Sequence, residues 1–275
     1  MLDCLQAGDI KAAVAENNNI DIDVVVHQTI DSTNSWALQQ CKLGRMLPFA
    51  GFAEQQTRGR GRRGKQWVTS VHSNIAMSLS WSYLMSRMRL HLLPLSIAMA
   101  IVTTLENLGL RQVQVKWPND VLVQGKKIAG ILIETQPIND EEVAVVVGIG
   151  LNYKMPGQKI LKKEGMDVFS EITDINREIE VQATDQKVDR TDVAALLLQN
   201  TIDVMQDYLS EPERYLERFR TRYDFCKDKR VEIILDNGDR RAGVARGVNE
   251  NAELLVMIDG KQHTFNSAQV SVKAL

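Results

Sequence analysis

Two periods of apolar and polar residues alternate along the chain, and they predict the order of its helices and strands. From 75 to 82, every second residue is large and apolar, and the residues between are alanine or serine. That period of two is typical of a strand with one large-residue face and one small-residue face. Residues 93–108 are apolar at helical spacing and stop at Gly109, which predicts a buried helix.

The other elements of this first part are shorter. Strands are predicted at 24–26, 51–53, 113–115, 121–123, 128–134 and 143–151, and helices at 33–43, 191–209 and 210–223. Ser32 or Thr33 can cap the first of these helices, and Gly44 can end it. Residues 154–190 are polar without clear periodicity and are assigned to no element. The pattern predicts an α+β fold in which a mixed sheet is flanked by helices.

The pattern changes after Tyr223. Four short strands are predicted there, at 231–235, 244–248, 253–258 and 263–265. The Asn-Gly and Asp-Gly pairs between them are strong hairpin turns. These strands predict a small β-barrel. We therefore divide the chain into a short helix-prone segment at 1–21, a larger α+β domain at 22–225 and the barrel at 226–275.

Length and composition fit a soluble enzyme of this plan. The chain has 275 residues, 44% hydrophobic and 25% charged, and its net charge of −2 gives no general attraction to nucleic acid or an anionic membrane. It shows no export signal and no run of about 18 apolar residues. Its three cysteines form no CxxC pair, which is typical of a reducing compartment. We expect a cytoplasmic protein that does not enter a membrane.

The segment most informative about chemistry is the run GRGRRGKQW at 59–67. It contains GxGxxG and nearly spells GxxxxGK[ST], but a strand rather than a helix is predicted after it, so the context of both nucleotide motifs is missing. Five cations in the eight positions 58–65, with three glycines, suit a loop that closes over phosphate oxygens. A nucleic-acid patch and a solvated basic turn remain alternatives at this point.

Two further segments place polar residues at the ends of predicted strands. KWPND at 116–120 puts an asparagine and an aspartate in a turn, where both could simply bond to their own backbone. KIAG at 127–130 puts Lys127 at the start of an apolar strand, where a lysine either reaches solvent or points at a ligand. Gly130 leaves space for close approach within that strand.

Taken together, these segments resemble the biotin protein ligases. The matching segments are DSTN at 31–34, EQQ at 54–56, the loop at 59–64 with Trp67, KWPND, KIAG, and GIGLN at 148–152. GRGRRG alone is a weak signal, and it becomes strong because KWPND and KxAG follow at this spacing. The resemblance begins near residue 22 and implies a class II synthetase-like catalytic domain with a C-terminal SH3-like barrel.

The resemblance implies a reaction in two steps. The carboxylate of biotin attacks the α-phosphate of ATP, in the presence of Mg²⁺, and gives biotinyl-5′-adenylate and pyrophosphate. A lysine of a biotin carboxyl carrier domain then attacks the mixed anhydride, and AMP leaves. No protein nucleophile is required, and no dedicated protein cage for the metal is implied.

The resemblance also implies the residues of the site. The residues expected to bind biotin are Ser32, Thr33, Asn34, Gln56, Gly59, Arg60, Gly61, Arg62, Lys127 and Gly130. Those expected to bind ATP or the adenylate are Arg62, Trp67, Asn119, Lys127 and Asn152. In this scheme Lys127 bridges the biotin carboxylate and the α-phosphate, and Arg62 neutralises charge as pyrophosphate leaves. Asp120 orients Lys127 or receives the incoming amine.

Some members of this family carry an N-terminal winged-helix domain and act as repressors. Only about 20 residues precede the first predicted strand here, so we expect a ligase without specific DNA binding. Both a monomer and a homodimer are compatible with the sequence. The alternatives are a lipoate or octanoate protein ligase, a nucleic-acid-binding module that uses the 58–65 loop, and a catalytically silent biotin-binding protein.

Overall fold

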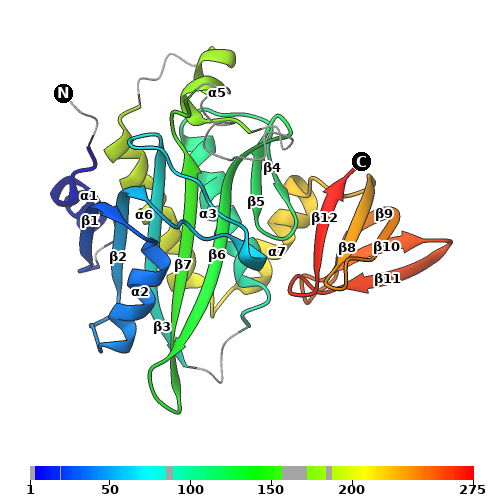
Figure 1. Cartoon of the computed structure of the whole chain (residues 1–275), viewed down its shortest axis with the longest axis horizontal. Helices are drawn as coiled ribbons and strands as arrows, with labels where there is room; N and C mark the ends of the chain where they lie inside the picture. Colours follow the sequence, from blue (N-terminus) through cyan, green and yellow to red (C-terminus); the bar gives the residue numbers. More distant parts are fainter. Residues whose placement is uncertain (1–3, 19, 85–88, 157–171, 184–187) are drawn as a thin grey trace.

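The computed structural model describes residues 4–18, 20–84, 89–156, 172–183 and 188–275. Its strands form two sheets, a large one in the first part of the chain and a smaller one at the C-terminal end (Figure 1). The predicted α+β class is therefore confirmed.

The large sheet has seven strands in the order β1-β2-β3-β7-β6-β5-β4. Their bounds are β1 Asp23–Ile30, β2 Phe49–Gln56, β3 Asn74–Leu84, β4 Val113–Lys116, β5 Asp120–Val123, β6 Lys126–Pro137 and β7 Glu142–Asn152. β1 and β2 are parallel and the other pairings are antiparallel, so the sheet is mixed, as predicted.

Helices lie on both faces of this sheet. Their bounds are α1 Ala7–Asn18, α2 Thr33–Lys42, α3 Leu93–Asn107, α5 Ile175–Val181, α6 Arg190–Asp207 and α7 Pro212–Arg218, which continues into the π-helical turn η3, Phe219–Tyr223. α3 and α6 cover the face with large side chains, whereas α2 packs against the opposite face. None of the helices in the described part of the chain is long and apolar enough to cross a membrane.

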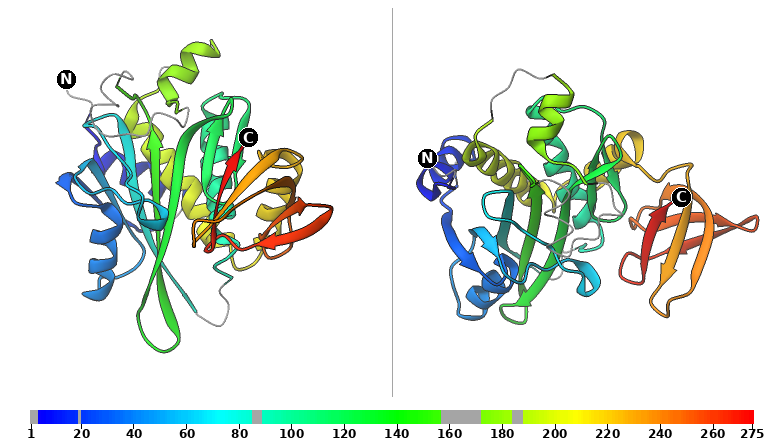
Figure 2. Two further views of the ribbon diagram at one scale, coloured as in Figure 1. Left: turned by 45° about the vertical axis from the view of Figure 1, so that its right-hand side comes forward. Right: turned by 45° about the horizontal axis from the view of Figure 1, so that its top comes forward.

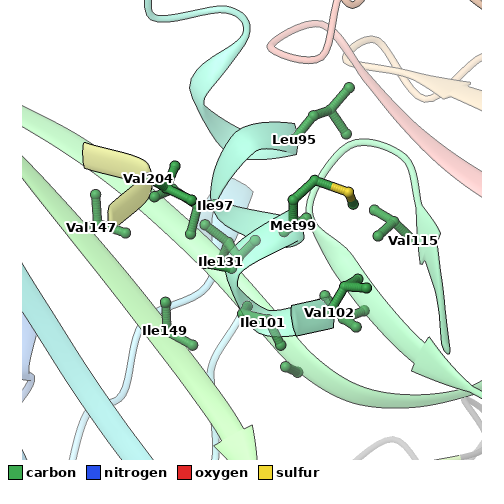
Figure 3. Close-up of a cluster of buried hydrophobic side chains, with 14 of the residues drawn as sticks. Leu95, Ile97, Met99, Ile101, Val102, Val115, Ile131, Val147, Ile149 and Val204 are labelled. Carbon is green, nitrogen blue, oxygen red and sulfur yellow. The ribbon is translucent and has the colours of Figure 1, made fainter. Parts of the chain in front are cut away.

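Large and small residues alternate along the central strands, as predicted for residues 75–82, and this alternation explains which face of the sheet α3 covers. Large residues of the central strands point toward α3, where Ile97 and Ile101 meet Ile131, Val147 and Ile149 in one apolar cluster (Figure 3). All five side chains are buried. Burial of this apolar surface is the main force that holds helix and sheet together.

The opposite face is almost without side chains where β3, β7 and β6 run side by side. Ser78 of β3 pairs with Gly148 of β7, and Ala76 pairs with Gly150. Gly150 in turn pairs with Gly130 of β6. Because residues two apart in a strand share a face, these small residues form one shallow floor.

The C-terminal sheet has five antiparallel strands in the order β11-β10-β9-β8-β12. It lies to one side of the large sheet, in orange and red in Figure 2. Their bounds are β8 Arg230–Leu235, β9 Arg240–Val248, β10 Leu254–Ile258, β11 Lys261–Phe265 and β12 Val270–Ala274. The sequence predicted four of these strands and missed β12. This strand is short, contains a lysine and lies beside β8. The pairing order is open at β11 and β12, so closure into an SH3-like barrel stays a prediction.

Trp117 connects the two sheets. Its side chain is buried, and its Nε1 donates a hydrogen bond to the Ala252 carbonyl at 2.8 Å. The Phe225 N–H donates to the Val115 carbonyl at 3.0 Å and ties the start of the C-terminal part to β4. The tryptophan of KWPND therefore serves packing between the two parts.

Two segments differ from the sequence interpretation. The helix predicted at 210–223 is divided into α7 and a π-helical turn. Within residues 154–190, which were assigned to no element, α5 begins after Asp174, whose side chain accepts a hydrogen bond from the Arg177 N–H. Residues 157–171 and 184–187 of that stretch lie outside the described residues.

Candidate active site

A cavity of about 220 Å³ opens over the small-residue floor. The start of α2, the arginine–glycine loop, the KWPND turn, β6, β7 and β12 line it. All predicted site residues line this cavity except Gly59 and Asn152. The structure thus brings together segments that are far apart in the sequence.

The start of α2 and Gln56 form one end of the cavity, which we call the amide end because the amides of Asn34 and Gln56 line it. Ser32 is the N-cap, and its hydroxyl accepts from the Ser35 N–H at 3.5 Å. The backbone N–H and hydroxyl of Thr33 both donate to Gln56 Oε1, at 2.9 and 3.2 Å. Because its carbonyl oxygen is engaged in this way, Gln56 presents its amide N–H groups as the donors for a ligand.

Asn34 is held in one orientation beside Gln56. Its Nδ2 donates to the Leu132 carbonyl at 3.2 Å and to Glu134 Oε2 at 3.0 Å. Its Oδ1 accepts from Ser78 Oγ at 2.6 Å. An amide nitrogen carries two hydrogens, so the remaining capacity of Asn34 is that of an acceptor. A donor and an acceptor therefore lie together at this end.

The arginine–glycine loop folds over the other part of the floor. The Trp67 N–H donates to the Gly59 carbonyl at 2.9 Å and closes the loop at its base. The indole of Trp67 lies directly on Gly150, where an added Cβ would stand 2.2 Å from Cε2. It also lies on Gly130, with an added Cβ 3.1 Å from Cζ3. The glycines of β6 and β7 therefore create the space for this aromatic ring.

Lys127 brings one positive charge to the cavity. Its Nζ lies 2.6 Å from Asp120 Oδ1, and the two side chains are 27% and 25% exposed. The same Nζ lies 5.5 Å from the centre of the Trp67 ring. The Lys127 carbonyl accepts from the Thr173 N–H at 2.9 Å, which fixes the start of β6.

Arg62 brings a second positive charge. Its Nη1 donates to Asn119 Oδ1 at 2.9 Å, and its Nη2 donates to the Ser267 carbonyl. Burial lowers the pKa of Arg62, and the nearby Asp120 carboxylate opposes that effect. Arginine stays protonated in proteins, so this group presents a fixed charge to an anion.

Two predicted residues lie beneath the cavity rather than on its surface. Asn152 is buried, with Nδ2 donating to the Thr173 carbonyl at 3.0 Å and Oδ1 accepting from Asn74 Nδ2 at 2.9 Å. An added Cβ on Gly59 would stand 2.1 Å from the Trp67 carbonyl oxygen. Gly59 thus permits the loop to close, and direct ligand contact by either residue stays a prediction.

Sequence reasoning missed three residues at this site. Ser78 supports Asn34 and Thr33, and the small-residue face of its strand was the available signal. Glu134 lies four residues after Gly130 on the same strand face, so the alternation of strand residues could have placed it at the site. Ser271 lines the cavity from β12, which the sequence did not predict.

A second polar cluster lies elsewhere, at Cys4, Glu54 and His72. Ligand atoms of these residues lie within 4.8 Å of one another, in a combination of donors that metals use. However, Arg190 Nη2 lies 2.6 Å from Glu54 Oε2, and both side chains are almost fully buried. The guanidinium already balances the carboxylate, so we interpret this cluster as a buried ion pair that joins the N-terminal segment to α6.

Comparison with known proteins agrees with this geometry. A profile of the biotin/lipoate A/B protein ligase family matches residues 26–152. The chain is 29% identical over 255 residues to the bifunctional ligase/repressor BirA of Escherichia coli, with 91% of this chain and 74% of that protein aligned. It is 28% identical over 264 residues to the biotin–[acetyl-CoA-carboxylase] ligase of Mycobacterium tuberculosis, with 90% and 87% aligned.

The fold is also shared with a solved structure. The biotin protein ligase of Aquifex aeolicus in complex with biotin and ATP superposes with a TM-score of 0.72 at 20% identity, over 92% of this chain and 99% of that one. The resemblance first seen in the motifs is confirmed. Residues 26–152 match the biotin/lipoate A/B protein ligase family, and most of the chain is similar to the biotin protein ligases.

Proposed function

We propose that this chain is an ATP-dependent biotin protein ligase, which forms biotinyl-5′-adenylate and transfers biotin to a lysine of a biotin carboxyl carrier domain. One observation carries the proposal: a single cavity has an amide end, where Gln56 offers a donor and Asn34 an acceptor, and a cationic end at Arg62 and Lys127. A cyclic urea offers N–H donors and a carbonyl acceptor, which suit the first end. A carboxylate and a polyphosphate suit the second.

The first step joins two anions. An oxygen of the biotin carboxylate bonds to the α-phosphorus of ATP, and the bond to pyrophosphate breaks. Two unit charges 4 Å apart repel by about 4 kcal/mol at the effective dielectric near a protein surface. The Lys127 ammonium offsets this repulsion, and Asp120 holds it in place at 2.6 Å. Arg62 stabilises the charge that develops on the leaving pyrophosphate.

The second step transfers the acyl group. The amine of the acceptor lysine attacks the acyl carbon, and AMP leaves with the electron pair of the broken bond. The amine must lose a proton during this step. Asp120, on the cavity wall beside Lys127, is the carboxylate that we assign to orient Lys127 or to receive the amine and its proton.

Magnesium would enter the site with ATP. Asp120 is the carboxylate among the residues that line the cavity, and it already pairs with Lys127. Mg²⁺ at nucleotide sites is commonly held by phosphates and water with one or two carboxylates. The donor set therefore fits an ion carried mainly by the nucleotide, with Asp120 as its protein ligand.

Several further features belong to this proposal. The division at 1–21, 22–225 and 226–275 and an SH3-like barrel are supported by the separate five-stranded sheet. A cytoplasmic location is supported by three free cysteines. We expect no specific DNA binding, which an operator-binding assay at physiological salt tests. A monomer and a homodimer both remain compatible with the proposal.

The experiment that tests the proposal is pyrophosphate release by the purified protein with ATP and biotin, with and without an acceptor domain. Labelled biotin, lipoate and octanoate compared side by side separate this ligase from lipoate or octanoate ligases. Release with biotin alone, followed by label on the acceptor, supports the proposal. Binding of biotin without pyrophosphate release contradicts it, as does a salt-dependent affinity for nucleic acid as the sole activity.

A further inference from the structure

Glu134 lies beside Asn34 at the amide end of the cavity, where no step of the proposed reaction requires a carboxylate. Its Oε2 accepts from Asn34 Nδ2 at 3.0 Å. Its Oε1 accepts from Arg60 Nη2 at 2.6 Å. One carboxylate on β6 therefore holds both α2 and the arginine–glycine loop.

These contacts draw Arg60 across the amide end. Its Nη1 donates to Ser35 Oγ of α2 at 3.4 Å, while its Nη2 reaches Glu134 on β6. The side chains of Arg60 and Glu134 are 43% and 22% exposed, so the pair lies at the surface of the site. Backbone bonds close the loop at its base, and the Arg60 side chain adds a contact that ties the loop to α2 and β6.

The position of Glu134 along β6 explains how a carboxylate is compatible with a site for anions. The Nζ of Lys127 stands 3.4 Å from where a Cβ on Gly130 would lie, and Glu134 is four positions further along β6. At about 3.3 Å per residue, those four positions span roughly 13 Å. The guanidinium of Arg60, 2.6 Å from Glu134 Oε1, also offsets the charge of the carboxylate. Distance and pairing therefore both weaken the effect of Glu134 on the end where carboxylate and phosphate would react.

We propose that Glu134 is a positioning residue for the vitamin, an inference that rests on the proposed function. It acts through two other residues. It holds the Asn34 amide with its oxygen toward the ligand, and it holds Arg60 across the bound ring system. Both effects slow the release of biotin and of the adenylate, and neither changes the charge at the reacting end.

Glu134→Gln tests this proposal with a side chain of the same shape. Glutamine has one acceptor oxygen, so either Asn34 or Arg60 must face its NH₂ group and lose its hydrogen bond. For a charged but partly exposed pair, we expect biotin dissociation to accelerate about threefold to tenfold. Stopped-flow measurement of the dissociation and association rates gives the readout. The melting temperature and the association rate should change little.

The matched control is Glu232→Gln. Glu232 pairs with Arg240 in the C-terminal sheet, and its side chain is also 22% exposed. This variant should leave biotin dissociation unchanged. Arg60→Gln completes a double-mutant cycle, because removal of Arg60 from the Glu134→Gln protein should add less than it does in the wild type.

The outcomes separate this inference from the proposed function. If the wild type binds biotin, faster release from Glu134→Gln with a non-additive cycle supports the positioning role. Unchanged release, or full additivity with Arg60→Gln, overturns that role and leaves the ligase assignment intact. If the wild type does not bind biotin at all, the proposed function itself fails.

Discussion

Two glycines of β7 allow the two ends of the cavity to be perturbed separately. Gly148 and Gly150 lie on the same strand face, two residues apart. An added Cβ on Gly148 would stand 2.1 Å from Asn34 Oδ1, and one on Gly150 would stand 2.2 Å from Trp67 Cε2. Gly148→Ala should therefore weaken the binding of biotin, and Gly150→Ala should weaken the binding of ATP.

The magnitudes follow from the contacts that must break. Asn34 cannot yield to a methyl group without losing its bonds to Ser78 and Glu134, at 2.6 and 3.0 Å. A displaced Asn34 no longer offers its oxygen to biotin, and the loss of that hydrogen bond, about 0.5–1.5 kcal/mol, corresponds to roughly a 2- to 12-fold rise in the dissociation constant of biotin. Displacement of Trp67 removes a stacking surface worth about 1–3 kcal/mol, or roughly 5- to 160-fold in the KM for ATP.

The assays are calorimetric titration of biotin and the ATP dependence of pyrophosphate release. Gly51→Ala is the matched control, because its Cβ would stand 2.3 Å from Trp36, which packs behind the cavity and does not line it. This control should lower stability without separating the two affinities. If Gly148→Ala and Gly150→Ala weaken biotin and ATP in the same proportion, the division of the cavity into two ends is refuted.

The remaining predictions concern charge and burial. Lys127→Ala and Arg62→Ala should each slow adenylate formation about 10²- to 10³-fold with an unchanged melting temperature. Lys126 does not line the cavity, so Lys126→Ala should form the adenylate at a near-normal rate. Near-normal turnover of Lys127→Ala and Arg62→Ala would contradict the assignment. Burial raises the pKa of Asp224, so the folded state binds the proton of this carboxyl more tightly than the unfolded state does. The free energy of unfolding therefore falls as pH rises above the pKa that Asp224 has in the unfolded chain. Asp224→Asn should therefore gain stability relative to the wild type as pH rises above the unfolded pKa of Asp224, and a difference in melting temperature that does not grow with pH contradicts this. Burial, with Asp224 nearby, raises the pKa of Cys226 to about 12, so this thiol should resist alkylation at pH 8 in the folded protein, as mass spectrometry can measure.

Local patterns were sufficient to predict most of the large sheet. The period of two at 75–82 gave both the strand β3 and its small-residue face, because side chains alternate regardless of what they contact. The pairing of Ser78 with Asn34, 44 residues away, could not be read from that period. It depends on α2 crossing the sheet, which is a tertiary arrangement.

The C-terminal sheet shows the limit more clearly. Arg62 donates to the carbonyl of Ser267, 205 residues later, and Arg63 donates to Ser271 Oγ at 2.9 Å. Backbone carbonyls carry no sequence signal, and β12 is too short and too polar to stand out. That the arginines could bind an anionic ligand was predictable from their residue type, whereas their partners within the protein depend on the fold and were not predictable.

The placement of the site on β6 explains how one rigid element can serve two unlike chemistries. Lys127 lies near the start of β6, Gly130 makes room for Trp67, and Leu132 and Glu134 accept the two hydrogens of the Asn34 amide. β6 pairs with β5 from Lys126 to Gly130 and with β7 from Ala129 onward, so these positions cannot shift along the strand independently. In a regular strand Lys127 and Gly130, three positions apart, would face opposite sides. A pairing irregularity, in which Val121 pairs with Ala129 and Leu122 pairs with Lys127, turns Lys127 to the cavity face. The register of β6 and this bulge therefore together set the order of charges along the cavity, and a one-residue slip would destroy that order.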